Sequence, residues 1–260
     1  MIINKTLANF QELLDIMTRL RAECPWDKEQ TFDTLRKLTI EETYELADAI
    51  IRDDLTDIKK ELGDLLLHIV FYAKIGEEKK SFDINSVIES INEKLIHRHP
   101  HIFGDVTVSN ADDVKKNWEA LKLKEGKKTV LEGVPIGLPA LIKANRIQEK
   151  ARGVGFDWED RTQVWGKVME EFNELKHEIL KNPDSEKVEA EFGDLFFSII
   201  NAARLYNVEP ENALERTNRK FISRFNYLES QTMQKGKSLH DMSLDEMNKI
   251  WEEAKKFDND

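Results

Sequence analysis

The stretch EEFNELKHEILKNPDSEKVEAEFGD, residues 170–194, decides the fold of this chain. It begins with a Glu-Glu-x-x-Glu group and ends with a Glu-x-x-Asp group. Because positions three or four apart share one face of a helix, each group presents its carboxylates together. The break at Asn182-Pro183 is short. It predicts two antiparallel helices, near residues 161–181 and 185–206, whose acidic faces lie side by side.

The second helix continues as LFFSIINAARLY, residues 195–206, and is apolar on nearly every side, so we expect it to be largely buried. A buried carboxylate is costly unless it is paired or binds a metal, and neighbouring carboxylates repel one another. A divalent cation removes both costs, and helix bundles build carboxylate metal sites from facing helices. The pattern therefore predicts a metal site whose ligands are Glu171, Glu174, Glu191 and Asp194.

The first half of the chain repeats this pattern. EETYE at residues 41–45 and ELGD at residues 61–64 precede the two acidic groups by 129 and 130 residues. NEKLIHR at residues 92–98 and KNWE at residues 116–119 also have counterparts, in the same order, in the second half. Four collinear matches indicate a tandem duplication. The first half, which also carries an apolar helix after its ELGD, offers a second candidate set of metal ligands: Glu42, Glu45, Glu61 and Asp64.

Helical periodicity dominates the rest of the chain, and no segment alternates convincingly at the period of a strand. We expect helices near residues 4–23, 31–52, 55–76, 83–98, 110–124, 138–152, 161–181, 185–206, 209–231 and 243–257. The stretch KEGKKTVLEGVPIGLP, residues 124–139, is rich in Gly and Pro and marks a connector. The sequence thus predicts an all-α chain of two tandem helical-bundle domains, 1–125 and 140–260, joined by a linker at 126–139.

The overall composition argues against several classes of function. The net charge is −11 with no evident basic face, so direct nucleic-acid binding is not expected. The N-terminus does not resemble a signal peptide, no apolar run reaches ~18 residues, and the single cysteine, Cys24, fits a cytoplasmic location. The all-oxygen ligand set favours Mg²⁺, with Mn²⁺ as a substitute. A ferritin-like di-iron site would want Glu-x-x-His pairs in both halves, and the acids of the first half have none.

Six motifs, two of which contain the acidic groups of the first half, stand out in the sequence. They are CPWDKEQT (24–31), EETYEL (41–46), ELGDLLL (61–67), RHPHIFGD (98–105), LEGVPIGLPAL (131–141) and VGFDW (154–158). Together they resemble the MazG family of all-α nucleoside triphosphate pyrophosphohydrolases, and the resemblance covers nearly the whole chain. It implies two tandem MazG-type domains that form a homodimer. It also implies Mg²⁺-dependent hydrolysis of nucleoside triphosphates to nucleoside monophosphate and pyrophosphate, in the control of nucleotide pools.

The resemblance also assigns roles to individual residues. Mg²⁺ would be bound by Glu171, Glu174, Glu191 and Asp194, with Glu170 as a second-metal ligand or as the base that orients the attacking water. The residues that would meet the substrate are Lys167, Lys187, Lys220, Arg224 and Trp251. Lys220 and Arg224 share one helix face and could clamp a triphosphate. The resemblance implies catalysis in the second half, where two-repeat members of the family are credited with the activity, and the first half has Asp57 in place of Lys187. The first half is then either a second site or a dimerisation scaffold.

Two other interpretations stay open on the sequence alone. A narrower relative, such as a dUTPase-like or a phosphoribosyl-ATP pyrophosphohydrolase, would share the metal site and differ in the substrate pocket. A non-enzymatic helical interaction protein could use the same acids for a regulatory Mg²⁺ or a basic partner. Substitution of Glu171 and Glu174 separates these cases, because an interaction protein would keep its partner whereas an enzyme would lose turnover.

Overall fold

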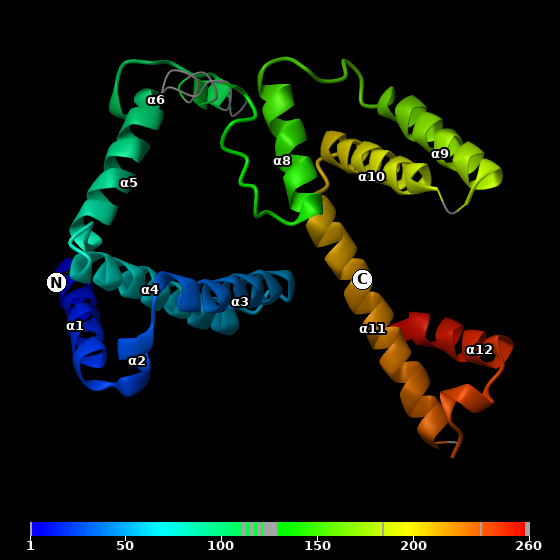
Figure 1. The fold of residues 1–260 in the computed structure, drawn as a ribbon, viewed down its shortest axis with the longest axis horizontal. Coiled ribbons are helices and arrows are strands. Elements are labelled where there is room, and N and C mark those ends of the chain that lie inside the picture. The colour runs from blue at the N-terminus through cyan, green and yellow to red at the C-terminus, as the bar shows by residue number, and fades with distance from the viewer. Residues whose placement is uncertain are drawn as a thin grey trace. The chain divides into compact units, whose positions relative to one another are not determined.

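The computed structural model describes residues 2–110, 113–114, 117–118, 121, 129–183, 185–234 and 236–257. Every regular element in these residues is a helix, which confirms the all-α prediction, and no helix among them is long and apolar enough to cross a lipid bilayer. The chain divides into two compact units, Met1–Ser109 and Asn110–Asp260 (Figure 1). Much of the expected helix at 110–124 and part of the expected linker at 126–139 lie outside the described residues, and the predicted domain division stays a prediction.

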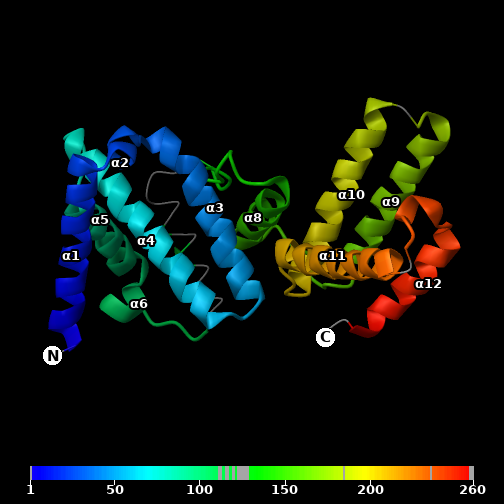
Figure 2. The ribbon, with the colours of Figure 1, turned by 90° about the horizontal axis from the view of Figure 1, so that it is seen from below.

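The first unit is built around a pair of adjacent helices. Its elements are α1 (Ile2–Glu23), α2 (Pro25–Glu29), α3 (Phe32–Ile51), α4 (Leu55–Glu78), α5 (Ile84–Arg98) and α6 (Pro100–Phe103). Helices α3 and α4 lie side by side along their length, and α1 packs against α4 (Figure 2). The core contains Met17, Leu35, Val70, Phe71 and Ile75. The apolar positions of α4 at three- and four-residue spacing therefore form the centre of this unit.

Local sequence signals start the helices of the first unit. The Thr31 hydroxyl accepts a hydrogen bond from the Thr34 amide at the start of α3, and Asp83 does the same for the Ser86 amide at the start of α5. The Asp54 carboxylate accepts from the amides of Thr56 and Asp57 at the start of α4. Each of these side chains satisfies amides that lack a partner in the first turn of a helix.

Arg21 joins three segments of the first unit. Its guanidinium donates to both oxygens of Glu78 at the end of α4, at 2.9 and 2.5 Å. It also donates to the carbonyl oxygens of Asp27 and, at 3.1 Å, of Gln30. Two of these acceptors belong to the motif CPWDKEQT, which contains the short helix α2. Hydrophobic periodicity does not predict this helix, because five residues are too few to show a repeat.

The second unit repeats the paired-helix arrangement. Its elements are α8 (Ala140–Gly153), α9 (Val164–Lys181), α10 (Glu186–Leu205), α11 (Pro210–Gln234), the 3₁₀ turn η1 (Leu239–Asp241), α12 (Leu244–Ala254) and the 3₁₀ turn η2 (Lys255–Phe257). Helices α9 and α10 lie side by side, and α12 packs on α11 (Figure 2). Val164, Val168 and Ala202 are buried between α9 and α10. The core thus holds the two acidic helices next to one another.

A buried ion pair joins α10 to the segment between α8 and α9. Arg204 on α10 donates to both carboxylate oxygens of Asp157, at 3.0 and 2.5 Å, and to Asn201 Oδ1 at 2.7 Å. The Arg204 side chain is 7% exposed and that of Asp157 is 17% exposed. Burial alone would raise the pKa of Asp157, but the hydrogen bonds from Arg204 and from the Trp158 amide outweigh it and lower that pKa. Asp157 therefore stays ionised.

The expectation that the acid-bearing helices are largely buried is wrong for one side of each. On α10, Phe192, Phe196 and Ile199 are exposed, Phe196 to 60%. On α4 the equivalent side exposes Leu62, Leu66 and Ile69. Each helix is apolar on two sides, and only one of them meets the core of its own unit. An apolar periodicity on two sides indicates two contact surfaces, and the second need not lie within the same chain.

Candidate metal centre

The α9–α10 pair brings three of the predicted ligands together. Carboxylate oxygens of Glu171, Glu191 and Asp194 lie within 4.8 Å of one another. Glu171 is 7% exposed and Glu191 is half-buried, so the cluster sits partly inside the helix pair. The fourth predicted ligand, Glu174, lines the adjacent pocket and raises the pKa of Glu191 through its charge. The arrangement follows from the spacing of the acids on two neighbouring helices.

The residues present fit a hard divalent cation. Glu191 Oε2 is buried and has no hydrogen-bond partner. Burial, and then the charges of Glu174, Asp194, Glu171 and Glu178, raise the pKa of the Glu191 carboxyl. A carboxylate oxygen that is buried and unpaired costs free energy that a bound cation would recover. The donor atoms are all oxygens, which is the set that Mg²⁺, Mn²⁺ and Ca²⁺ prefer.

Lys167 is the cation that faces the cluster in the structure. Its Nζ donates to Glu170 Oε1 at 2.8 Å and lies 2.7 Å from Glu171 Oε1. The hydrogen bonds to Glu170 and Glu171 raise the pKa of Lys167. The predicted contact of Lys167 with a phosphate stays a prediction. In this structure the ammonium is a counter-ion of the same acids that were predicted to bind metal and to orient water.

An open pocket lies beside the acids and includes residues that the sequence analysis missed. Its lining residues are Glu170, Asn173, Glu174, His177, Glu178 and Glu191. Five of the six belong to α9, at offsets of zero, three, four, seven and eight residues from Glu170, so they form one helix face. That spacing was readable in the sequence. Asn173, His177 and Glu178 were overlooked because they fall between or beyond the acidic motif itself.

The remaining predicted substrate residues gather on other elements of the second unit. The Arg224 guanidinium carbon lies 5.6 Å from the centre of the Trp251 ring, and the Phe221 ring centre lies 5.0 Å from that of Trp251. Lys220, one residue before Phe221 on α11, is exposed, as is Lys187 in the first turn of α10. Arg224 and Trp251 thus form a basic-aromatic cluster between α11 and α12.

The first unit has its own acidic cluster. Carboxylate oxygens of Glu42, Glu45 and Glu61 lie within 4.8 Å of one another across α3 and α4. Burial, and then the charges of Asp64, Glu45 and Glu61, raise the pKa of Glu42. The internal repeat of the sequence is therefore also present in the structure: each unit has a pair of adjacent helices with a cluster of carboxylates between them.

Together, these observations describe an all-α protein in which paired helices gather carboxylates into a candidate site for a divalent cation. Comparison with known proteins supplies the family. Residues 30–103 and 161–228 match the MazG nucleotide pyrophosphohydrolase domain. The chain belongs to the MazG family, and this family implies dependence on a divalent metal.

Named relatives agree with this assignment. The nucleoside triphosphate pyrophosphohydrolase of Escherichia coli strain K12 is 41% identical over 256 residues, which cover 95% of this chain and 97% of the relative. The nucleoside triphosphate pyrophosphohydrolase/pyrophosphatase MazG of Thermotoga maritima is 44% identical over 252 residues, 95% of either chain. A crystal structure of a MazG-related protein from Thermotoga maritima is 29% identical, with a TM-score of 0.39, and covers 44% of this chain and 98% of its own.

Proposed function

We propose that this protein hydrolyses nucleoside triphosphates to nucleoside monophosphate and pyrophosphate, with Mg²⁺ held in the second unit by Glu171, Glu174, Glu191 and Asp194. The observation that carries the proposal is the buried, unpartnered Oε2 of Glu191 inside a group of carboxylates. Relatives named for this activity match nearly the full chain. A protein with a net charge of −11 needs such a cation to accept a polyanion.

The chemistry required of the side chains is limited. Mg²⁺ bound at the acids would neutralise charge on the phosphate oxygens as the pyrophosphate leaves. Water adds to the α-phosphorus, the bond to the bridging oxygen breaks, and one proton of the water must be accepted. Glu170 is the acceptor that we propose, because its exposed carboxylate lines the pocket beside the cluster. A triphosphate would draw the Lys167 ammonium towards its own oxygens and leave Glu170 able to accept that proton.

The basic-aromatic cluster supplies positive charge and an aromatic ring, which the acidic cluster lacks. Lys220 and Arg224 offer cationic donors for phosphate oxygens, and the guanidinium of Arg224 can bind two oxygens at once. Trp251 offers a flat ring on which a base can stack. We propose that these residues, with Lys167 and Lys187, orient the triphosphate for in-line attack.

The direct test is a measurement of pyrophosphate and monophosphate release from a panel of ribo- and deoxyribonucleoside triphosphates. With Mg²⁺ we expect equal amounts of the two products, and with excess EDTA we expect none. Mn²⁺ added after the chelator is expected to restore release, because it accepts the same oxygen ligands. Release of orthophosphate in place of pyrophosphate, or turnover that survives the chelator, would contradict the proposal.

We further propose that the exposed face of α10 is covered by a second copy of the chain. Phe192, Phe196 and Ile199 stand at four- and three-residue spacing and form one apolar stripe. Neighbouring α9 adds the exposed side chains of Trp165 and Met169. An exposed apolar surface of this kind suits burial in a two-fold homodimer, which is also the assembly that the sequence resemblance implied.

Phe196→Glu is expected to convert the dimer into a monomer, because a carboxylate at the centre of an apolar interface would lose its hydration without gaining a partner. Sedimentation velocity measures the change. Leu244→Glu is the matched control: Leu244 is also an exposed apolar residue of the second unit, but it lies in the first turn of α12, away from the stripe. If the Phe196→Glu protein sediments like the wild type, the proposed interface is wrong.

A further inference from the structure

The pocket beside the acids of the second unit extends along α9 as far as His177. Glu170 and Glu174 line the same pocket, seven and three positions before His177. At 1.5 Å of rise per residue, the pocket therefore follows the helix for about 10 Å from Glu170 to His177. Glu170, the proposed proton acceptor, lies at one end. His177 and Glu178 line the other end, and the imidazole is the only group at that end that can donate a hydrogen bond to an anion.

The order of the side chains along the pocket matches the order of the reacting groups. In an in-line displacement, the attacking water and the leaving group lie on opposite sides of the phosphorus. With the water at Glu170 and the α-phosphate beside the proposed metal ligand Glu174, the leaving pyrophosphate lies towards His177. The ring N–H of His177 is a suitable donor for one of its oxygens.

Lys187 lies at the same end of the pair, on the neighbouring helix. A carboxylate oxygen of Glu191 lies within 4.8 Å of one of Glu171, and Glu191 shares the pocket with Glu174. Lys187 comes four residues before Glu191, and the two helices run in opposite directions, so Lys187 is level with His177. Both side chains are exposed, and neither forms a hydrogen bond or an ion pair with another residue that the structure describes.

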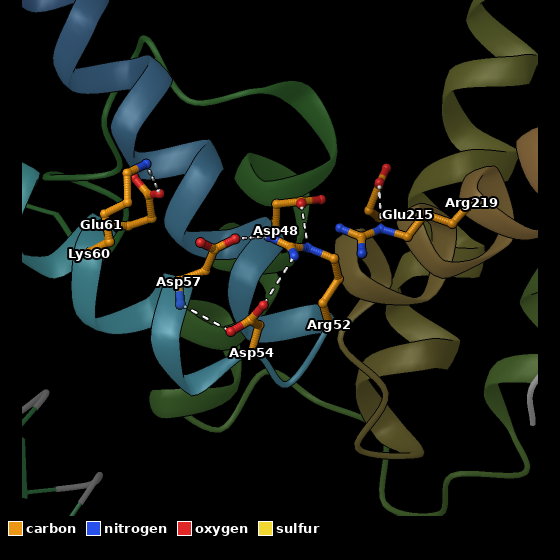
Figure 3. Close-up of polar contacts among 8 residues, drawn as sticks. All are labelled: Asp48, Arg52, Asp54, Asp57, Lys60, Glu61, Glu215 and Arg219. Atoms are coloured by element: carbon orange, nitrogen blue, oxygen red, sulfur yellow. Dashed lines mark hydrogen bonds and ion pairs between the residues drawn. The ribbon is translucent and has the colours of Figure 1, made fainter.

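The first unit shows that these two positions can bind one group together. Offsets of 129 and 130 residues, the same that relate the acidic motifs, place Asp48 and Asp57 where the second unit has His177 and Lys187. The guanidinium of Arg52 donates to Asp48 at 3.0 Å and to Asp57 at 2.6 Å, as Figure 3 shows. Two anionic side chains thus hold one cation in the first unit. The second unit has two hydrogen-bond donors at the same positions, which suit an anion.

We propose that His177 and Lys187 form a subsite for the terminal phosphate groups of the substrate, and that His177 is a residue by which the chain selects triphosphates. The inference rests on the proposed function for its substrate. It adds to the site a residue that lies outside the acidic motif. The two donors face the pyrophosphate, whose negative charge grows as its bond to the α-phosphorus breaks, so they favour its departure.

The test compares inhibition of the full chain by its two products, with free Mg²⁺ held constant. His177→Phe keeps an aromatic ring and removes the donor. The inhibition constant of pyrophosphate is expected to rise about tenfold, as for the loss of one hydrogen bond to a charged oxygen. That of the nucleoside monophosphate should stay within about twofold. Lys176→Met, at an exposed position on another face of α9, is the control and should change neither constant.

A double variant tests whether the two donors share one partner. Lys187→Met is also expected to raise the inhibition constant of pyrophosphate. In the protein that carries both changes, the rise should be smaller than the product of the two single effects, because residues that bind the same group are coupled. A rise equal to that product would mean that the two side chains act on separate groups, and would overturn the shared subsite.

Calorimetric titration with magnesium pyrophosphate separates this subsite from the proposed function, because it needs no turnover. If the wild type hydrolyses triphosphates but His177→Phe binds pyrophosphate as tightly as the wild type does, the subsite is wrong and the function stands. If the wild type hydrolyses no triphosphate yet binds pyrophosphate, and His177→Phe weakens that binding, the function is wrong and the subsite stands. An equal rise in the constants of both products would contradict the assignment of His177 to the terminal phosphates.

Discussion

Glu191→Gln is expected to lower the kcat for pyrophosphate release by about a thousandfold, or ~4 kcal/mol in the activation barrier. The substitution keeps the shape of the side chain but removes the negative charge that would face the proposed cation, beside Glu171 and Asp194. The substitution is not expected to lower the stability of the folded protein. Because burial and neighbouring acids raise the pKa of Glu191, its ionised form is less favourable in the folded chain without metal than in the unfolded chain. The melting temperature in EDTA is therefore expected to stay the same or to rise.

The matched control is Glu189→Gln. Glu189 lies on the same helix two positions earlier, is exposed, and points to a different face. Its substitution should leave kcat within about twofold of the wild-type value, as expected for a surface position. Full activity in Glu191→Gln would contradict the assignment of the metal site to the second unit. A lowered melting temperature in EDTA would instead mean that Glu191 stabilises the fold.

Asp157→Ala is expected to reduce the unfolding free energy of the second unit by about 3 kcal/mol, because it leaves the guanidinium of Arg204 buried without its ionic partner. Urea denaturation at pH 7 measures the change. The double variant Asp157→Ala/Arg204→Met should be more stable than Asp157→Ala alone, since both charges are then removed. Glu159→Ala, an exposed acid of the same loop, is the control and should change stability by less than about 0.5 kcal/mol.

The same pair predicts a dependence on pH. The pKa of Asp157 is lower in the folded chain than in the unfolded one, so its contribution is complete above the unfolded value, near 4, and is lost as the pH falls through the folded value. The stability difference between wild type and Asp157→Ala should therefore be constant from pH 7 to pH 5 and shrink below about pH 4. A difference that persists at pH 2 would show that the pairing of the two charges is not its cause.

Much of the fold and of the clustering of the carboxylates could be predicted because the signals are local. Helix periodicity and capping residues such as Thr31, Asp54 and Asp83 act over one or two turns. The acidic motifs work in the same way, since three- and four-residue spacing fixes which carboxylates share a face. The convergence of Glu171 with Asp194 then required only a short connection between two helices.

The other features of the structure depend on contacts that the local sequence pattern does not predict. No spacing rule places the Lys60 ammonium on Glu61, because adjacent residues on a helix point to different faces and only a bent lysine stem brings them together. The pairing of Arg204 with Asp157 joins positions 47 residues apart. The sequence predicts a buried position for the exposed stripe through Phe196, because hydrophobicity indicates a contact surface but not the partner that covers it.

Both acidic clusters are assembled from helices that follow one another directly in the sequence. Helix α4 begins four residues after α3 ends, and α10 begins five residues after α9 ends. Closing so short a connection costs little chain entropy, and contacts of low sequence separation form early in folding. Each cluster can therefore come together while the chain is still leaving the ribosome, as soon as its own hairpin has emerged. A cation captured then would bias the nascent hairpin towards its native pairing before the rest of the protein exists.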